Sequence, residues 1–159
     1  MARHLPTYVG MTHRAEQTLS DSLRQVGEGH PDDGEVGVVA EVLAAFHDEH
    51  VRRLGPIAER YGEEHVDEPE RLHADGLSQT RKGPVGLLRD LQDLYLLASL
   101  VETSWMVLVQ AAQGARDKEL QEVGEQALTD AGRTLQWLTT QIKVSAPQAL
   151  LASLIHRGQ

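Results

Sequence analysis

The sequence predicts an all-α fold: a bundle of four long helices with one long crossover between the second and the third. Four segments carry apolar residues at spacings of three and four, the period of a helix with one buried face. No segment alternates apolar and polar residues over the length of a strand. Two connections between the helical segments are short and the middle one is long, so we expect a single bundle domain over residues 1–159.

The first helix is predicted from about Pro6 to Val26, because proline suits a first turn in which no backbone donor is needed. A segment rich in glycine at 27–34 ends it. The second helix is predicted over Glu35–Tyr61 and contains Pro56. Because proline removes a hydrogen bond and collides with the carbonyl group four residues earlier, we expect a kink or a break there.

Residues 62–84 are polar and acidic and show little periodicity. A connection of this length can return along the whole bundle, so the third helix is predicted to start at the end opposite to the one where the second stops. The third helix is predicted over Val85–Gln113, with Gly114 as its C-terminal cap. It is apolar on nearly all faces, which favours either the most buried position in the bundle or a contact between subunits.

The fourth helix is predicted to begin after Asp117, a suitable N-cap, and to end at Pro147. A short apolar helix at 149–155 is expected to follow. This segment and the apolar outer faces of the third helix predict a homodimer, because a monomer rarely leaves both in water. Alternatively, the C-terminal segment docks on a partner protein as an amphipathic helix.

Composition disfavours several classes of function. The net charge of −9 disfavours binding to nucleic acids and to anionic membrane surfaces. The chain has no cysteine, which excludes zinc–thiolate sites, and no apolar run long enough to predict a membrane span. Its N-terminus lacks the apolar core of a signal peptide, so we expect a cytoplasmic protein. Phosphate loops, serine-hydrolase elbows and the His-Glu-x-x-His motif are absent from the sequence.

Carboxylate and imidazole groups that project inward from facing helices form the metal sites of bundles, and a spacing of three residues places two ligands on one face. His13 and Glu16 have this spacing in the first helix, and His47 and His50 have it in the second. Glu102 lies in the most apolar helix, where a carboxylate needs a partner. The candidate metal ligands are therefore Glu16, His47, His50 and Glu102. The structural alternative is a pair of half-buried histidines and a Glu102 that faces solvent.

The second helix, with Glu41-Val-Leu-Ala-Ala-Phe-His47-Asp-Glu-His50, resembles the metal-binding helix of the ferritin-like superfamily. The segment Ala15-Glu16-Gln-Thr-Leu19 is similar to the first-helix carboxylate segment of that superfamily, and Glu102 stands where its third-helix carboxylate would fall. The resemblance to the superfamily spans roughly residues 8–143, and the chain is similar in general character to small bacterial ferritin-like stress proteins. It implies a di-iron or di-manganese site with two Glu-x-x-His pairs.

The sequence departs from that pattern in both halves. His47 stands where the second helix would carry a glutamate, and the segment Ala131-Gly-Arg-Thr134 of the fourth helix lacks both expected ligands. Asp130, just before it, is expected to pair with Arg133 or to face solvent.

Three functions remain open. The first is a bundle with a degenerate or absent metal site that acts by oligomerisation or partner binding, with a link to stress. The second is an oxidase or detoxifying protein that holds iron or manganese with the four candidate ligands. The third is a sensor that binds a small molecule in an apolar pocket between the helices.

Overall fold

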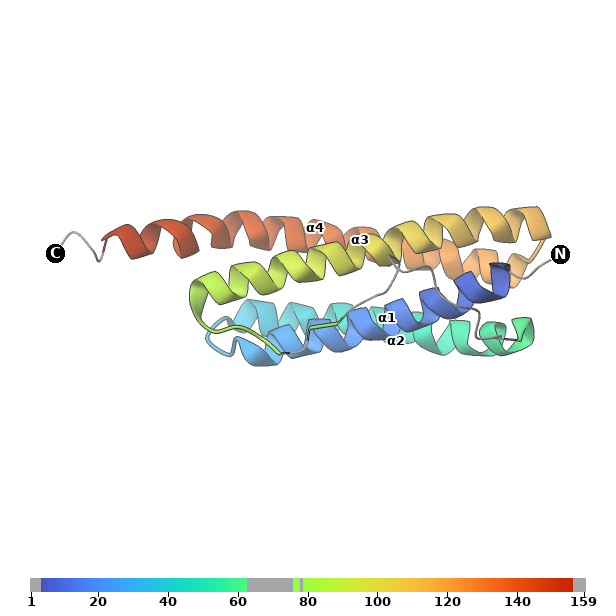
Figure 1. The fold of residues 1–159 in the computed structure, drawn as a ribbon, viewed down its shortest axis with the longest axis horizontal. Helices are drawn as coiled ribbons and strands as arrows, with labels where there is room; N and C mark the ends of the chain where they lie inside the picture. The colour runs from blue at the N-terminus through green and yellow to red at the C-terminus, as the bar shows by residue number, and fades with distance from the viewer. Residues whose placement is uncertain (1–3, 63–75, 78, 156–159) are drawn as a thin grey trace.

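The chain folds into long helices. The computed structural model describes residues 4–62, 76–77 and 79–155. Within these it contains α1 (His4–Gly29), α2 (Gly34–Tyr61), α3 (Gly83–Ala115) and α4 (Lys118–Ile155), and no strand (Figure 1). The predicted all-α fold of four helices is confirmed. Most of the predicted long loop, residues 63–75, lies outside the described residues.

Each helix packs against two others. α1 contacts α2 and α3, and α4 contacts α3 and α2. Figure 1 shows α1 and α4 running in one direction and α2 and α3 in the other. Tyr61 at the end of α2 donates a 2.5 Å hydrogen bond to Asp117 between α3 and α4, and His30 after α1 lies 2.7 Å from Asp90 near the start of α3. The end of α2 and the start of α3 therefore lie at opposite ends of the bundle.

The core follows the bundle along its length and consists mainly of leucine and other aliphatic side chains. The largest apolar members are Trp105, Leu19, Leu23, Leu54, Ile57, Leu91, Leu94, Leu108, Leu120 and Leu138, all buried. At Gly124, α4 approaches α3 so closely that an added Cβ would lie 2.5 Å from Cγ2 of Val109. Glycine is therefore required there for the two helices to pack at this distance.

Two helices continue through prolines that were expected to end or bend them. α2 continues past Pro56 to Tyr61, and α4 continues past Pro147 to Ile155. The predicted break at Pro147 and the separate C-terminal helix are therefore wrong. Each proline stands in a buried stripe that continues on both sides, with Leu54 and Ile57 around Pro56 and Ser145 and Ala149 around Pro147. Packing of these residues offsets the hydrogen bond that each proline removes.

The connection between α3 and α4 is partly as predicted. Asp117 accepts a 3.1 Å hydrogen bond from the backbone N–H of Leu120, which confirms it as a cap of α4. Gly114 is not the cap of α3: the helix continues to Ala115, and Arg116 takes the left-handed conformation with φ of 57°. The N–H of Arg116 reaches the carbonyl groups of the last turn, so the capping geometry forms without a glycine.

Apolar side chains remain exposed on α3 and at the end of α4. Leu96 and Val107 of α3 are 69% and 49% exposed, whereas Leu97 is buried. Leu150 and Leu151 are each 56% exposed, and they lie toward the end of α4 that extends beyond the other helices (Figure 1). These residues form the exposed apolar surface that the sequence predicted.

Among the described helices, α3 is long and apolar enough to cross a membrane by length and composition alone. The most apolar helix of a packed core passes the same test. In this structure α3 packs against α1 and α4 and contributes Trp105 and a seam of leucines to the core.

Candidate metal centre

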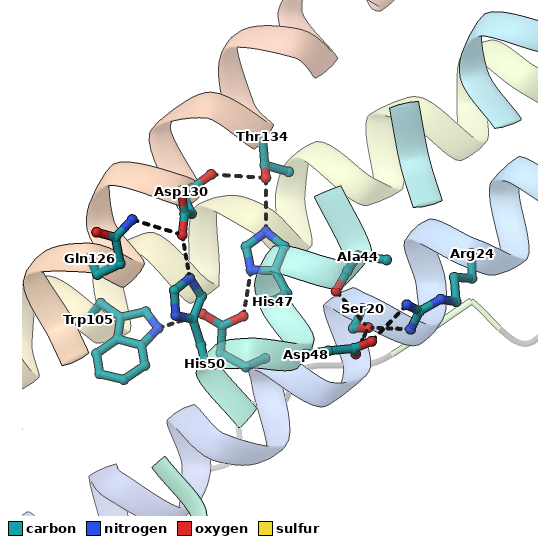
Figure 2. Close-up of polar contacts among 11 residues, drawn as sticks. Ser20, Arg24, Ala44, His47, Asp48, His50, Trp105, Gln126, Asp130 and Thr134 are labelled. Carbon is teal, nitrogen blue, oxygen red and sulfur yellow. Dashed lines mark hydrogen bonds and ion pairs between the residues drawn. The ribbon is translucent and has the colours of Figure 1, made fainter. Parts of the chain in front are cut away.

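Polar side chains from all four helices meet inside the apolar core. They are Glu16 of α1, His47 and His50 of α2, Trp105 of α3, and Asp130 and Thr134 of α4, each buried. Figure 2 shows both imidazoles extending from α2 toward Asp130 and Thr134 of α4. Residues that lie far apart in the sequence thus form one polar network.

Three of the four predicted ligands come together. Glu16 and His47 are 0% exposed and His50 is 1% exposed. The spacing of three residues places both imidazoles on the same face of α2, with ring centroids 5.9 Å apart. One ligand atom from each of the three side chains lies within 4.8 Å of the other two.

Both oxygens of the Glu16 carboxylate have a partner. Trp105 donates its indole N–H to Oε1 over 2.7 Å. Oε2 lies 2.6 Å from Nδ1 of His47. A buried carboxylate is stable in an apolar core because such charge-assisted hydrogen bonds replace water.

The tautomer of His50 follows from its neighbour. Its Nε2 lies 2.8 Å from Oδ2 of Asp130. An ionised carboxylate can only accept, so Nε2 carries the proton. Burial lowers the pKa of His50, and the nearby charge of Glu16 opposes this only in part. The ring is therefore neutral at pH 7, and its Nδ1 has a free lone pair.

The orientation of His47 follows from the hydroxyl group of Thr134. This hydroxyl donates to the backbone carbonyl of Asp130 over 3.0 Å and lies 2.9 Å from Nε2 of His47. Its single proton is used by the carbonyl, so its oxygen accepts from Nε2–H. Nδ1 of His47 then faces Oε2 of Glu16, and this short contact requires a cation, either a proton or a metal ion.

A surface network holds α1 and α2 in register beside the site. Ser20 donates to Asp48 and also approaches the carbonyl of Ala44 at 3.3 Å. Arg24 binds Asp48 at 2.7 Å and Glu41 at 3.0 Å (Figure 2 shows the contact with Asp48). The hydrogen bond from Arg24 lowers the pKa of Asp48. These contacts fix the level at which Glu16 of α1 meets α2.

Glu102 is not part of this cluster. It is half-buried, and the group of ligand atoms contains Glu16 and the two histidines without it. Trp105, one turn further along α3, occupies the place beside Glu16. His13, the partner of Glu16 in the predicted i, i+3 pair, instead donates to the carbonyl of Val51 over 3.1 Å.

The contribution of α4 was missed by the sequence reasoning. Asp130 was expected to pair with Arg133 or to face solvent, and it does contact Arg133 at 3.3 Å. It is nevertheless 3% exposed and binds His50 as well. The available signal was the spacing of four residues between Asp130 and Thr134, which places both on one helix face.

A second buried histidine–carboxylate pair lies near the other end of α3. His30 contacts Asp90 at 2.7 Å, and the backbone and guanidinium of Arg81 donate to the same carboxylate at 3.0 and 2.8 Å. With three donors around it, Asp90 is satisfied without a metal ion. This pair links the segment before α3 to the end of α1.

The central cluster, in contrast, has an unsatisfied ligand atom. Nδ1 of His50 is buried and has no hydrogen-bond partner among the described residues. Thr12 and Trp137 also have a buried polar atom without a partner among the described residues, but of these three residues only His50 belongs to a group of metal-ligand atoms. One carboxylate and two imidazoles form the mixed ligand set that suits iron, manganese or zinc, so the residues fit a divalent metal ion.

Comparisons of the chain with models of known families, with curated proteins and with solved structures found no match.

Proposed function

We propose that this chain is a ferritin-like bundle that retains a reduced metal site, and that it binds iron or manganese through Glu16, His47 and His50. The observation that carries the proposal is the free Nδ1 of His50, buried beside another imidazole and a carboxylate. Most buried side-chain polar atoms have a hydrogen-bond partner, whereas this one stands in a group of ligand atoms. The geometry thus favours metal binding over a bundle with no metal site.

The directions of the helices support the ferritin-like assignment. α2 ends where α3 ends, beside Asp117, and α3 begins near His30. A crossover along the bundle between α2 and α3 has this consequence, and it is the connectivity of ferritin-like folds.

For the bound metal we propose the reaction class of an oxidase or a detoxifying protein. Bound iron or manganese would supply one-electron redox chemistry. The chain's own part is to hold two imidazoles and one carboxylate together in the buried core. Because the ligands are 0 to 1% exposed, we expect only reactants as small as dioxygen or hydrogen peroxide to reach them.

Elemental analysis of the protein purified from cells grown with iron and manganese tests the proposal. We expect stoichiometric iron or manganese in the wild type and its loss in His50→Ala. His13→Ala is the matched control, because His13 also lies between α1 and α2 but bonds to a backbone carbonyl. Metal-free wild-type protein, or equal metal content in His50→Ala, would contradict the proposal.

A second candidate function is assembly or partner binding through the exposed apolar surface. Leu96 of α3 and Leu150 and Leu151 of α4 favour it, because they are more than half exposed. Light scattering after size-exclusion chromatography tests this candidate. A dimer that dissociates in Leu150→Asp/Leu151→Asp would support it, and a monomeric wild type would refute dimerisation.

A further inference from the structure

The structure assigns to α4 the role of orienting the metal ligands, an inference that rests on the proposed function. We infer that the site is built for one ion rather than two, and that Asp130 and Thr134 are positioning residues. They hold both imidazoles by Nε2, so that Nδ1 of His47 faces Glu16 and Nδ1 of His50 keeps a free lone pair.

Hydrogen-bond donors surround the carboxylate of Asp130. Its Oδ2 accepts from Nε2 of His50 at 2.8 Å and from the amide of Gln126 at 3.3 Å, and Oδ1 accepts from Arg133 at 3.3 Å. A carboxylate held by three donors is fixed in place, and it fixes the tautomer of His50. Without it, the proton could move to Nδ1 and block the ligand atom.

Thr134 performs the same task for His47. Its hydroxyl is held by the carbonyl of Asp130, one turn earlier on α4. The oxygen is therefore turned toward Nε2 of His47 at 2.9 Å. A valine at this position would keep the shape of the side chain but would remove the acceptor.

The site lacks the carboxylates that a second ion would need. Oε1 of Glu16 is occupied by Trp105, and both oxygens of Asp130 have donors. Glu102 lies outside the group of ligand atoms that the described residues form.

Nitrogen-15 NMR of the metal-free protein tests the positioning roles without any metal. Long-range proton–nitrogen correlations identify which ring nitrogen carries the proton. We expect His50 to be protonated at Nε2 alone in the wild type and to shift toward Nδ1 in Asp130→Asn. For His47 we expect a proton on Nε2 in the wild type and a weaker preference for it in Thr134→Val.

Titration with Mn²⁺ or, without oxygen, with Fe²⁺ tests the stoichiometry. We expect one ion per wild-type chain and an affinity about 10- to 100-fold lower in Asp130→Asn and in Thr134→Val. Asp90→Asn is the matched control, because it alters a buried histidine–aspartate pair outside the site and should leave the affinity unchanged. If Asp130→Asn does not fold, Thr134→Val and the wild-type tautomer still decide the question.

The possible failures are distinguishable. Two ions per chain would overturn the single-ion site and leave the proposed function intact. A wild-type His50 protonated at Nδ1, or unchanged affinity in both variants, would overturn the positioning roles. No uptake of either ion would overturn the proposed function and the single-ion site together.

Discussion

Replacing Trp105 with phenylalanine removes the indole N–H that donates to Glu16. The hydrogen bond is 2.7 Å long, and both side chains are completely buried. Leaving a charged acceptor without its donor costs about 1.5–3 kcal/mol, and the smaller ring leaves a cavity that adds to the loss. We therefore expect the free energy of unfolding of the metal-free protein to fall by about 2–4 kcal/mol.

Urea unfolding followed by circular dichroism measures this change. An unchanged slope of the free energy of unfolding against urea concentration would show that the native and the unfolded states keep their compactness. Trp137→Phe is the matched control, because the Trp137 N–H is buried with no partner among the described residues. It deletes a tryptophan without deleting a hydrogen bond and should cost less. Equal losses in the two variants, or a loss below about 1 kcal/mol for Trp105→Phe, would refute the role given to this contact.

Three further predictions follow from the structure. Metal at 100 times its dissociation constant should raise the free energy of unfolding by about 2.7 kcal/mol. This gain should disappear in His50→Ala, and thermal unfolding with and without a chelator measures it. Gly124→Ala should cost about 1–3 kcal/mol in urea unfolding, because the new Cβ would meet Val109 at 2.5 Å. Burial raises the pKa of Asp117, but hydrogen bonds from Tyr61 and Arg60 outweigh it, and the net shift is downward from 3.8. Stability should therefore be lost as the pH falls through that lowered pKa, and Asp117→Asn should flatten this dependence in unfolding experiments between pH 5 and pH 2.

The helices could be predicted because they depend on local periodicity. The stripes led to all four helices, and the N-cap of α4 at Asp117 was predicted correctly. The continuation of α4 past Pro147 could not be predicted, because it depends on whether the residues beyond the proline find a surface to pack on. That surface belongs to other helices, and local sequence does not contain it.

Some residues of the candidate site could be predicted from the sequence and others could not. Glu16, His47 and His50 could be found because helical spacing and chemistry select them. Asp130 could not be found in this way. It lies one position before the buried Ala131, and the sequence does not show whether its side chain turns outward to Arg133 or inward to His50. It does both, since its carboxylate lies at the edge of the buried face and reaches inward.

The buried polar cluster of Glu16, His47, His50 and Asp130 is costly for the stability of the fold. Two carboxylates and two imidazoles in the middle of a bundle lose their hydration, and well-packed apolar residues of the same volume often give equal or greater stability. The other buried pair, His30 with Asp90, joins the residue after α1 to α3, and Arg81 before α3 binds the same carboxylate, so this pair has a structural role. The central cluster joins helices that leucines already hold together, and it leaves one imidazole nitrogen without a partner among the described residues. These observations support the proposed metal site over a role in stability alone, because the group of ligand atoms contains Glu16 and both histidines.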